Sequence, residues 1–246
     1  VYVLEVNPRA SRTVPFVSKA IGYPLAKIAA RVMVGQSLEE QGFTHEVVPT
    51  YYSVKEAVLP FLKFPGTDIL LGPEMKSTGE VMGISDTVGE SYAKSQMAAN
   101  LRLPMSGTVF ISAGTDEQKA GLIEPARQLR DMGFELIATA GTQRFLAEHG
   151  VGTAFIPKLA EGRPHVIDLM KSNQISFVIN VPVGKASTAD EKRIRRETVR
   201  RGLPYMTTVA AARAAAEAIA VVREKEISVL SLQERHGDTI ESKVLV

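Results

Sequence analysis

The sequence predicts an α/β protein whose second half is a doubly wound, three-layer domain built on a five-stranded parallel sheet. From Thr108 onward, strand-like and helix-like segments alternate regularly. A helical pattern separates consecutive strands, and parallel strands need such a long return connection, which is right-handed. Segments 136–138 and 177–179 are continuously apolar, which is typical of strands covered on both faces. These observations together favour a single sheet with helices on both sides.

The expected elements of this half follow from apolar runs and apolar periodicity. Strands are expected at 108–112, 134–139, 153–156, 175–180 and 204–207, and helices at 117–132, 142–148, 166–171, 190–201 and 210–222. The remaining tail mixes charged residues with an Ile-Ser-Val-Leu run. Both an added strand and a partly mobile segment stay open for it.

The first hundred residues have a less regular pattern. A strand is expected at 1–6, helices at 24–34 and 87–99, and an apolar alternation at 52–59, while 66–83 is rich in turn-forming Pro and Gly. Residues 101–107 interrupt the pattern before the strand at Thr108. We therefore expect a first domain at 1–104, a second at 105–223 and a tail at 224–246.

The amino-acid composition limits the classes of function that can be expected of this chain. The 246 residues are 45% hydrophobic and 23% charged, and 29 basic against 27 acidic residues leave a net charge of +2. This balance gives no general reason to expect nucleic acid or an anionic membrane as a partner. The absence of cysteine excludes disulfides and thiolate chemistry and is compatible with a reducing compartment, so cytoplasm is the default. Without an initiator methionine or a leader-like segment, the chain is expected to be a fragment of a longer cytoplasmic protein.

The first motif lies on the expected N-terminal strand. Glu5 and Asn7 are two residues apart, so their side chains leave the same face of a strand. Carboxylate and amide oxygens suit a hard cation such as Mg²⁺. Arg9 and Arg12 follow, and each guanidinium can bind a phosphate oxygen. A strand end with solvated polar residues explains the same short pattern.

Three long runs carry a family resemblance. Segments 5–31, 52–61 and 71–83 resemble the second ATP-grasp half of the carbamoyl-phosphate synthetase large subunit. The resemblance implies part of a carbon–nitrogen ligase that makes carbamoyl phosphate from glutamine or ammonia, bicarbonate and two ATP, for arginine and pyrimidine biosynthesis. It implies Glu5 and Asn7 as ligands of Mg²⁺ or Mn²⁺, and Arg9 and Arg12 as catalytic residues at the phosphate end of the site that converts carbamate. A glutaminase small subunit is the implied partner, and the fragment alone is expected to be inactive.

The second motif is a strand that runs into a short glycine-containing turn and a helix at 134–142. This arrangement presents unpaired backbone N–H groups and the positive end of the helix dipole to an anion. Thr139 and Thr142 add hydroxyl donors, so phosphate is the expected ligand. A threonine that only caps its own helix is the alternative.

Residues 108–220 resemble the regulatory domain shared by carbamoyl-phosphate synthetase and methylglyoxal synthase, a Rossmann-type fold. The resemblance rests on 133–136, Lys158 with 161–165, and segments 178–180, 194–196 and 205–208. It implies a site for an allosteric nucleotide formed by Ser112, Lys119, Thr139, Thr142, Lys158 and Asn180. It also implies an ornithine site formed by Glu56, Tyr205 and Thr207, and an oligomer.

The pattern departs from the family after Asn180. Bacterial pyrimidine-regulated members have hydroxyl residues there, whereas this chain has Val181, Pro182 and Val183. Lost donors weaken binding by about 1 kcal/mol each, so UMP is expected first and IMP, or a weakened response, stays open. The sequence leaves undecided which effector binds, the sign of its effect and whether the glutaminase is fused.

Four alternatives accompany these interpretations. Methylglyoxal synthase is a lyase, but the loop at 159–165 lacks the aspartate of the Gly-Gly-Asp setting that lyase chemistry needs. His165 could be a base, although a capping role at its helix start explains it better. The basic run at 192–201 is interrupted by Glu197 and is expected to be a solvated helix. A stand-alone nucleotide-binding module without catalysis is the main alternative function.

Overall fold

The computed structural model describes residues 3, 6, 8–63, 75–183 and 188–237. By its internal contacts the chain forms two compact units, one of residues 1–53 with 227–246 and one of residues 54–226. We describe each unit by itself and refer to them as unit 1 and unit 2. This division differs from the expected domain ends at 104 and 223, which stay predictions.

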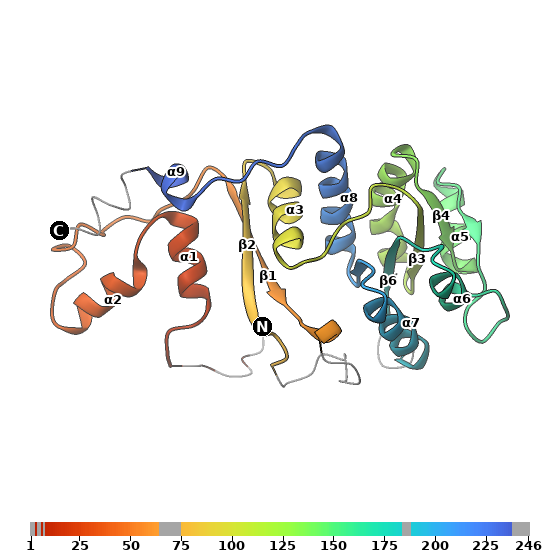
Figure 1. Ribbon diagram of the computed structural model, residues 1–246, viewed down its shortest axis with the longest axis horizontal. Helices are drawn as coiled ribbons and strands as arrows, with labels where there is room; N and C mark the ends of the chain where they lie inside the picture. The colour runs from red at the N-terminus through yellow and green to blue at the C-terminus, as the bar shows by residue number, and fades with distance from the viewer. Residues whose placement is uncertain (1–2, 4–5, 7, 64–74, 184–187, 238–246) are drawn as a thin grey trace. The chain divides into compact units, whose positions relative to one another are not determined.

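Unit 2 contains a five-stranded sheet with the strand order β5-β4-β3-β6-β7 (Figure 1). Every neighbouring pair is parallel, as predicted. The strands are β3 (Thr108–Ala113), β4 (Glu135–Ala138), β5 (Ala154–Phe155), β6 (Phe177–Val181) and β7 (Tyr205–Met206). From β3 the chain winds first towards β5 and then back to the other side of β3, so the fold is doubly wound.

Helices cover both faces of this sheet. One apolar cluster joins the sheet to α4 (Asp116–Asp131), α5 (Ala140–Glu148) and α8 (Val209–Glu224). A second cluster, on the opposite face, joins it to α6 (Val166–Lys171) and α7 (Thr188–Arg200). The alternation of side chains along β6 explains the two clusters, because Phe177 and Ile179 enter the first and Val178 the second.

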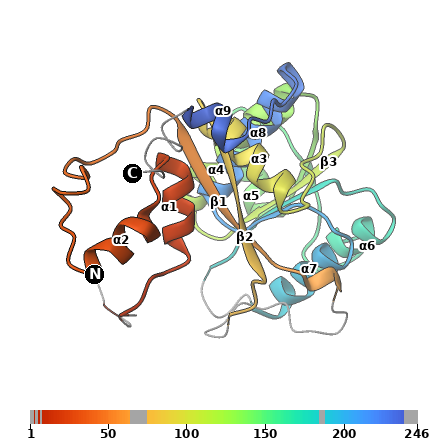
Figure 2. The same ribbon diagram turned by 60° about the vertical axis from the view of Figure 1, so that its left-hand side comes forward.

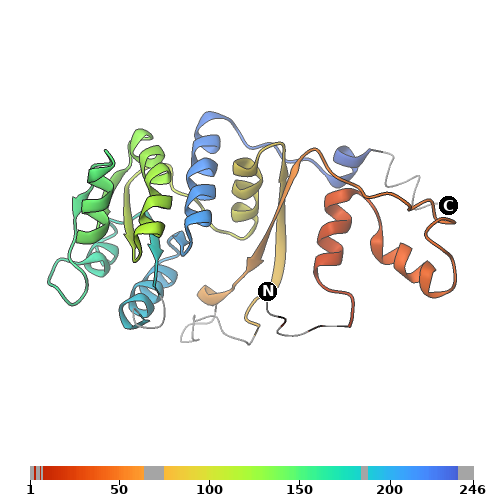
Figure 3. The same cartoon turned by 180° about the vertical axis from the view of Figure 1, so that it is seen from behind.

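The remaining elements of unit 2 precede the five-stranded sheet in the chain. Strands β1 (Tyr52–Val58) and β2 (Gly79–Ser85) form a two-stranded sheet, next to which η1 (Phe61–Lys63) is a single 3₁₀ turn (Figure 2). Helix α3 (Val88–Ala98) packs against β2 and α8 (Figure 3). A side chain at Gly89 would place its Cβ 3.1 Å from the backbone of Glu217, so glycine permits this close approach.

Unit 1 contains three helices among its described residues. Helix α2 (Leu25–Met33) confirms the helix expected at 24–34, whereas α1 (Thr13–Ile21) was not predicted. The tail contains α9 (Leu232–His236) rather than a strand, because Ser231 and Glu234 form a capping box at its start. The strand expected at 1–6 falls mostly outside the described residues. Among the helices of the described ranges, none has the length and apolar character that crossing a bilayer requires.

Candidate functional site

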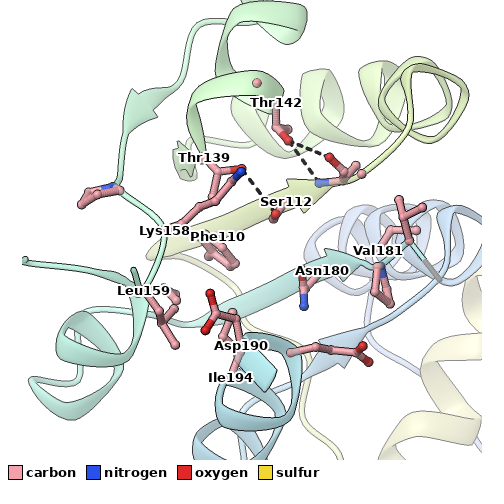
Figure 4. A pocket seen from close by; sticks show the side chains of 18 of the residues that line it. Phe110, Ser112, Thr139, Thr142, Lys158, Leu159, Asn180, Val181, Asp190 and Ile194 are labelled. Atoms are coloured by element: carbon pink, nitrogen blue, oxygen red, sulfur yellow. Dashed lines mark hydrogen bonds between the residues drawn. The ribbon is translucent and has the colours of Figure 1, made fainter. Parts of the chain in front are cut away.

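A cavity of about 470 Å³ lies at the carboxyl ends of the central strands of unit 2. Ser112 of β3 and Asn180 of β6 are partners in register and both line it. The chain direction reverses between these two strands, and ligands of open α/β sheets bind at such a switch point. The structure brings all six residues predicted for the nucleotide site to this cavity: Ser112, Lys119, Thr139, Thr142, Lys158 and Asn180. All of them except Lys119 are labelled in Figure 4.

Thr139 occupies the N-cap position of α5, but its hydroxyl makes no capping hydrogen bond with the described residues. The hydroxyl lies 3.3 Å from the hydroxyl of Ser112 instead (Figure 4). The first N–H groups of a helix have no partner within the helix. Two hydroxyls and the N-terminal end of α5 therefore face the cavity together, which is a favourable arrangement for an anion.

Thr142 has a different environment. Its hydroxyl accepts a hydrogen bond from the backbone N–H of Ala113 at 3.1 Å and lies 3.3 Å from the Ala113 carbonyl oxygen. The residue is 1% exposed. The hydroxyl therefore joins α5 to the end of β3. Because it is already hydrogen-bonded there, Thr142 contributes to the shape of the cavity and is not a free donor for a ligand.

Two lysines line the cavity beside the start of α5. The Lys119 ammonium lies 2.8 Å from a carboxylate oxygen of Asp116 and 5.8 Å from the centre of the Phe145 ring. The Lys158 ammonium is 3.8 Å from a carboxylate oxygen of Glu161, and its side chain is 60% exposed. An exposed ion pair at this distance is weak, so Lys158 can turn to an anionic ligand at little cost.

Sequence reasoning missed the wall that α7 contributes. Asp190 and Glu191 line the cavity with carboxylates, and Asp190 reaches into it (Figure 4). Glu191 is paired with Arg195 at 2.8 Å. Acidic residues in the first turn of a helix are common for electrostatic reasons alone, so only the position of α7 over the sheet assigns them to the cavity. Apolar side chains complete the wall: Phe110, Leu159 and Ile194.

The residues predicted for ornithine lie on β1 and at β7. Tyr205 accepts a hydrogen bond from Asn180 at 3.2 Å. Burial raises the pKa of Tyr205, and the nearby Asn180 and Arg195 offset part of this rise. Glu56 accepts a hydrogen bond from Gln96 at 2.9 Å, and burial raises the pKa of its carboxyl.

Glu56 and β7 are connected through Tyr92. The Tyr92 hydroxyl lies 3.2 Å from the sulfur of Met206, which stands between Tyr205 and Thr207 in the chain. Burial, followed by the charge of Glu56, raises the pKa of Tyr92. Glu56 and β7 therefore share a neighbour in Tyr92, and the role of the three predicted residues stays a prediction.

The first motif is only partly visible. Glu5 and Asn7, the predicted metal ligands, lie outside the described residues. Arg9 and Arg12 belong to unit 1 and are exposed, and Arg12 is the N-cap residue of α1. The guanidinium groups of Arg9 and Arg12 are thus accessible to solvent.

Two family models match this chain. The MGS-like domain matches residues 121–207, and the carbamoyl-phosphate synthase L chain ATP binding domain matches residues 1–41. The carbamoyl phosphate synthase large chain of Pasteurella multocida is 53% identical over 237 residues, which are 96% of this chain and 22% of that protein. The large chain of Nostoc sp. is 50% identical over 234 residues, 95% of this chain and 21% of that protein. Over nearly its whole length the chain is therefore similar to part of the carbamoyl phosphate synthase large chains.

The chain spans about a fifth of the length of these curated large chains. A crystal structure of methylglyoxal synthase from Elizabethkingia anophelis NUHP1 covers 46% of this chain and 79% of its own, with a TM-score of 0.39 and 20% identity. The family model, rather than this distant likeness, identifies the MGS-like domain. The cavity is built largely from that domain, since Thr139, Lys158 and Asn180 fall within residues 121–207.

His165 of the MGS-like domain is a capping residue, as predicted. It is the N-cap residue of α6, and its backbone N–H donates to a carboxylate oxygen of Asp168 at 3.0 Å. The same oxygen lies 2.9 Å from the ring nitrogen Nδ1. The residue is 7% exposed, so packing and capping account for it.

The basic run on α7 is balanced by acidic neighbours. Glu197 pairs with Arg200 at 2.6 Å and with Arg201 at 2.5 Å, and the two arginines lower the pKa of its carboxyl despite the opposing effect of burial. The expectation of a solvated helix agrees with the exposed side chains of Lys192, Arg193 and Arg196.

Proposed function

We propose that this chain is a portion of the large chain of a glutamine-dependent carbamoyl-phosphate synthetase. Its N-terminal residues would contribute metal and phosphate ligands to the site that phosphorylates carbamate with ATP. Its MGS-like domain would bind an allosteric nucleotide. The parent enzyme would receive ammonia from a glutaminase small subunit and would serve arginine and pyrimidine biosynthesis.

The single observation that supports the effector role is the convergence of six separated residues on one cavity. The two ends of the cavity differ in chemistry. Ser112, Thr139 and the start of α5 offer donors beside two lysines, which suits a phosphate group. Asp190 offers acceptors for ribose hydroxyls, and Phe110 with Ile194 offers an apolar surface for a base. A nucleoside monophosphate matches this order of groups, and we propose UMP first and IMP second.

Calorimetric titration tests this proposal. UMP, IMP and ornithine are added in turn to the unmodified chain and to the variant Lys158→Ala. We expect one nucleotide to bind and its affinity to fall about tenfold in the variant, because an ammonium–phosphate contact is lost. Lys171→Ala is the matched control, since Lys171 is an exposed lysine on α6. Failure of both nucleotides to bind would remove the effector assignment.

The catalytic contribution is proposed for the front of the chain. Glu5 and Asn7 would hold Mg²⁺ or Mn²⁺, which neutralises phosphoryl charge when bound. Arg9 and Arg12 would donate paired N–H groups to phosphate oxygens. The ATP binding domain model matches only residues 1–41, so we expect these 246 residues alone to form no carbamoyl phosphate. Ornithine is proposed to bind at Glu56, Tyr205 and Thr207, and the regulatory domain is proposed to support an oligomer.

A nucleotide-binding module without catalysis is the second candidate. It is favoured by the fact that the whole cavity lies within unit 2 and uses no residue of unit 1 among those described. An activity assay of a full-length large chain that contains this sequence distinguishes the two candidates. ATP-dependent carbamoyl phosphate formation that responds to the nucleotide supports the synthetase proposal, whereas nucleotide binding without turnover supports the module.

A further inference from the structure

Helix α8 is the last helix of unit 2, and the segment that follows it in the chain, with α9, belongs to unit 1 from residue 227 onward. We propose that residues 225–237 form a tether from the effector domain to helix α1, with Arg235 and His236 as positioning residues for Arg12. The inference rests on the proposed function of Arg12 at the phosphate end of the active site. Its physical basis is a fixed attachment at each end of the segment.

The first attachment lies in unit 2. Lys225 directly follows α8, and its ammonium is 2.6 Å from a carboxylate oxygen of Glu90 on α3. Glu90 has a 6% exposed side chain and also pairs with Lys94 at 3.0 Å. Burial alone would raise the pKa of Glu90, but Lys225, Ser85 and Lys94 together lower it to about 2. The carboxylate is therefore charged and holds the beginning of the tether.

The second attachment lies in unit 1, at the C-terminal end of α1. The ring nitrogen Nε2 of His236 is 2.8 Å from the carbonyl oxygen of Lys19. A carbonyl oxygen only accepts hydrogen bonds, so Nε2 carries the proton. Gly22 follows α1 with φ +74°, and a Cβ at this position would lie 2.7 Å from the His236 ring. Glycine therefore serves both the left-handed turn and the close approach of the ring.

Arg235 strengthens the same attachment. Its guanidinium carbon lies 4.9 Å above the ring of Tyr51, a distance at which a cation is attracted to an aromatic face. The Tyr51 hydroxyl donates to the carbonyl oxygen of Ala20 at 2.5 Å. Burial raises the pKa of Tyr51 despite the charge of Arg235, so the hydroxyl keeps its proton. Adjacent carbonyls of α1, at Lys19 and Ala20, are thus held by the tail and by Tyr51.

The local sequence of the tail favours the short helix α9, which carries Arg235 and His236. Ser231 and Glu234 form a capping box, with the Ser231 N–H 2.7 Å from a Glu234 carboxylate oxygen and the Glu234 N–H 3.1 Å from the Ser231 hydroxyl. The box starts a helix that carries Arg235 and His236 on its last turn. Helix α1 has nine residues and begins directly after Arg12. A helix of that length, about 13 Å, is rigid, so its held end determines where Arg12 lies.

Hydrogen exchange of the 246-residue chain tests the attachment. In Arg235→Ala/His236→Ala we expect the amides of α1 to exchange about tenfold faster, because local opening costs less. The amides of β3 and β6 should keep their rates. Gln233→Ala is the control, since Gln233 is exposed on the same helix. Arg235→Lys/His236→Gln keeps a cation and an N–H donor and should restore much of the protection. Unchanged exchange in α1 of the double alanine variant would overturn the tether.

Kinetics in a full-length large chain that carries this sequence test the positioning role. The double alanine variant should lower kcat for ammonia-dependent carbamoyl phosphate formation about tenfold with little change in KM for ATP, and should reduce the response to the bound nucleotide while its Kd stays constant. An unchanged kcat and response would refute positioning. If the unmodified large chain forms no carbamoyl phosphate, the proposed function fails, and the exchange result alone then decides the tether.

Discussion

The side-chain amide of Asn180 donates a hydrogen bond to the phenol oxygen of Tyr205 across 3.2 Å. The two residues come from the neighbouring parallel strands β6 and β7. One belongs to the proposed nucleotide set and the other to the proposed ornithine set. The Arg195 guanidinium lies 5.7 Å from the centre of the Tyr205 ring, and Arg195 is paired with Glu191 of the cavity wall. A change at Tyr205 should therefore alter nucleotide binding in the cavity.

Tyr205→Phe tests this connection. Removal of the phenol oxygen leaves the Asn180 amide without that acceptor, so the amide can turn away from its orientation in the cavity. We expect nucleotide affinity to fall about fivefold, as the loss of one neutral hydrogen bond implies. Calorimetry measures the change. Tyr92→Phe removes a phenol oxygen elsewhere in unit 2 and should leave the affinity near that of the unmodified chain; equal affinities in all three proteins would contradict the connection.

Glu90→Gln is expected to destabilise unit 2. The substitution removes the charge that Lys94 and Lys225 face in a largely buried site. A hydrogen-bonded charge of this kind contributes about 2 kcal/mol to the free energy of unfolding. Urea denaturation at neutral pH measures the difference. Glu226→Gln changes an exposed carboxylate next to Lys225 and should have a much smaller effect.

The effect of Glu90 should also depend on pH. The pKa of Glu90 in the folded chain is about 2, below its ordinary value of 4.5. A lowered pKa in the folded state means that the carboxylate stabilises the fold above pH 4.5, and that this contribution is lost as the pH falls towards 2. The unfolding free energies of Glu90→Gln and the unmodified chain should therefore converge below about pH 4. A constant difference from pH 7 to pH 3 would contradict the ion-pair explanation.

Pro182→Thr tests the departure from the family pattern after Asn180. Pro182 lines the cavity, and its carbonyl accepts a hydrogen bond from Gln118 at 3.3 Å. A threonine adds a hydroxyl donor to the cavity wall, so UMP affinity should rise about fivefold. Pro182→Val is the matched control, because it removes the proline ring without adding a hydroxyl. Equal affinities of the threonine and valine variants would show that the hydroxyl is not used.

Val181 illustrates what the pattern alone did not reveal. As an apolar residue after Asn180 it was expected to remove a donor from the site. The structure places its side chain in the apolar core at 6% exposure, while its backbone carbonyl accepts a hydrogen bond from Gly114 at 3.3 Å. Asn180 and Val181 both line the cavity (Figure 4), and Val181 also belongs to the apolar core of the domain. Val181, Pro182 and Val183 all line the cavity, so the expected loss of hydroxyl donors after Asn180 stays a prediction.

Local sequence was sufficient to predict much of the fold of this protein. The continuous apolar runs of β4 and β6 and the helical patterns between strands were sufficient to predict the parallel sheet, because burial on both faces imposes that composition. The runs that resemble carbamoyl-phosphate synthetases were sufficient to predict the relatives that the chain matches. Tertiary structure alone decided which distant residues meet, since packing places α7 with Asp190 over the cavity. It also brought His236 to Lys19, 217 residues away, a contact that no local pattern encodes because it depends on where the chain returns.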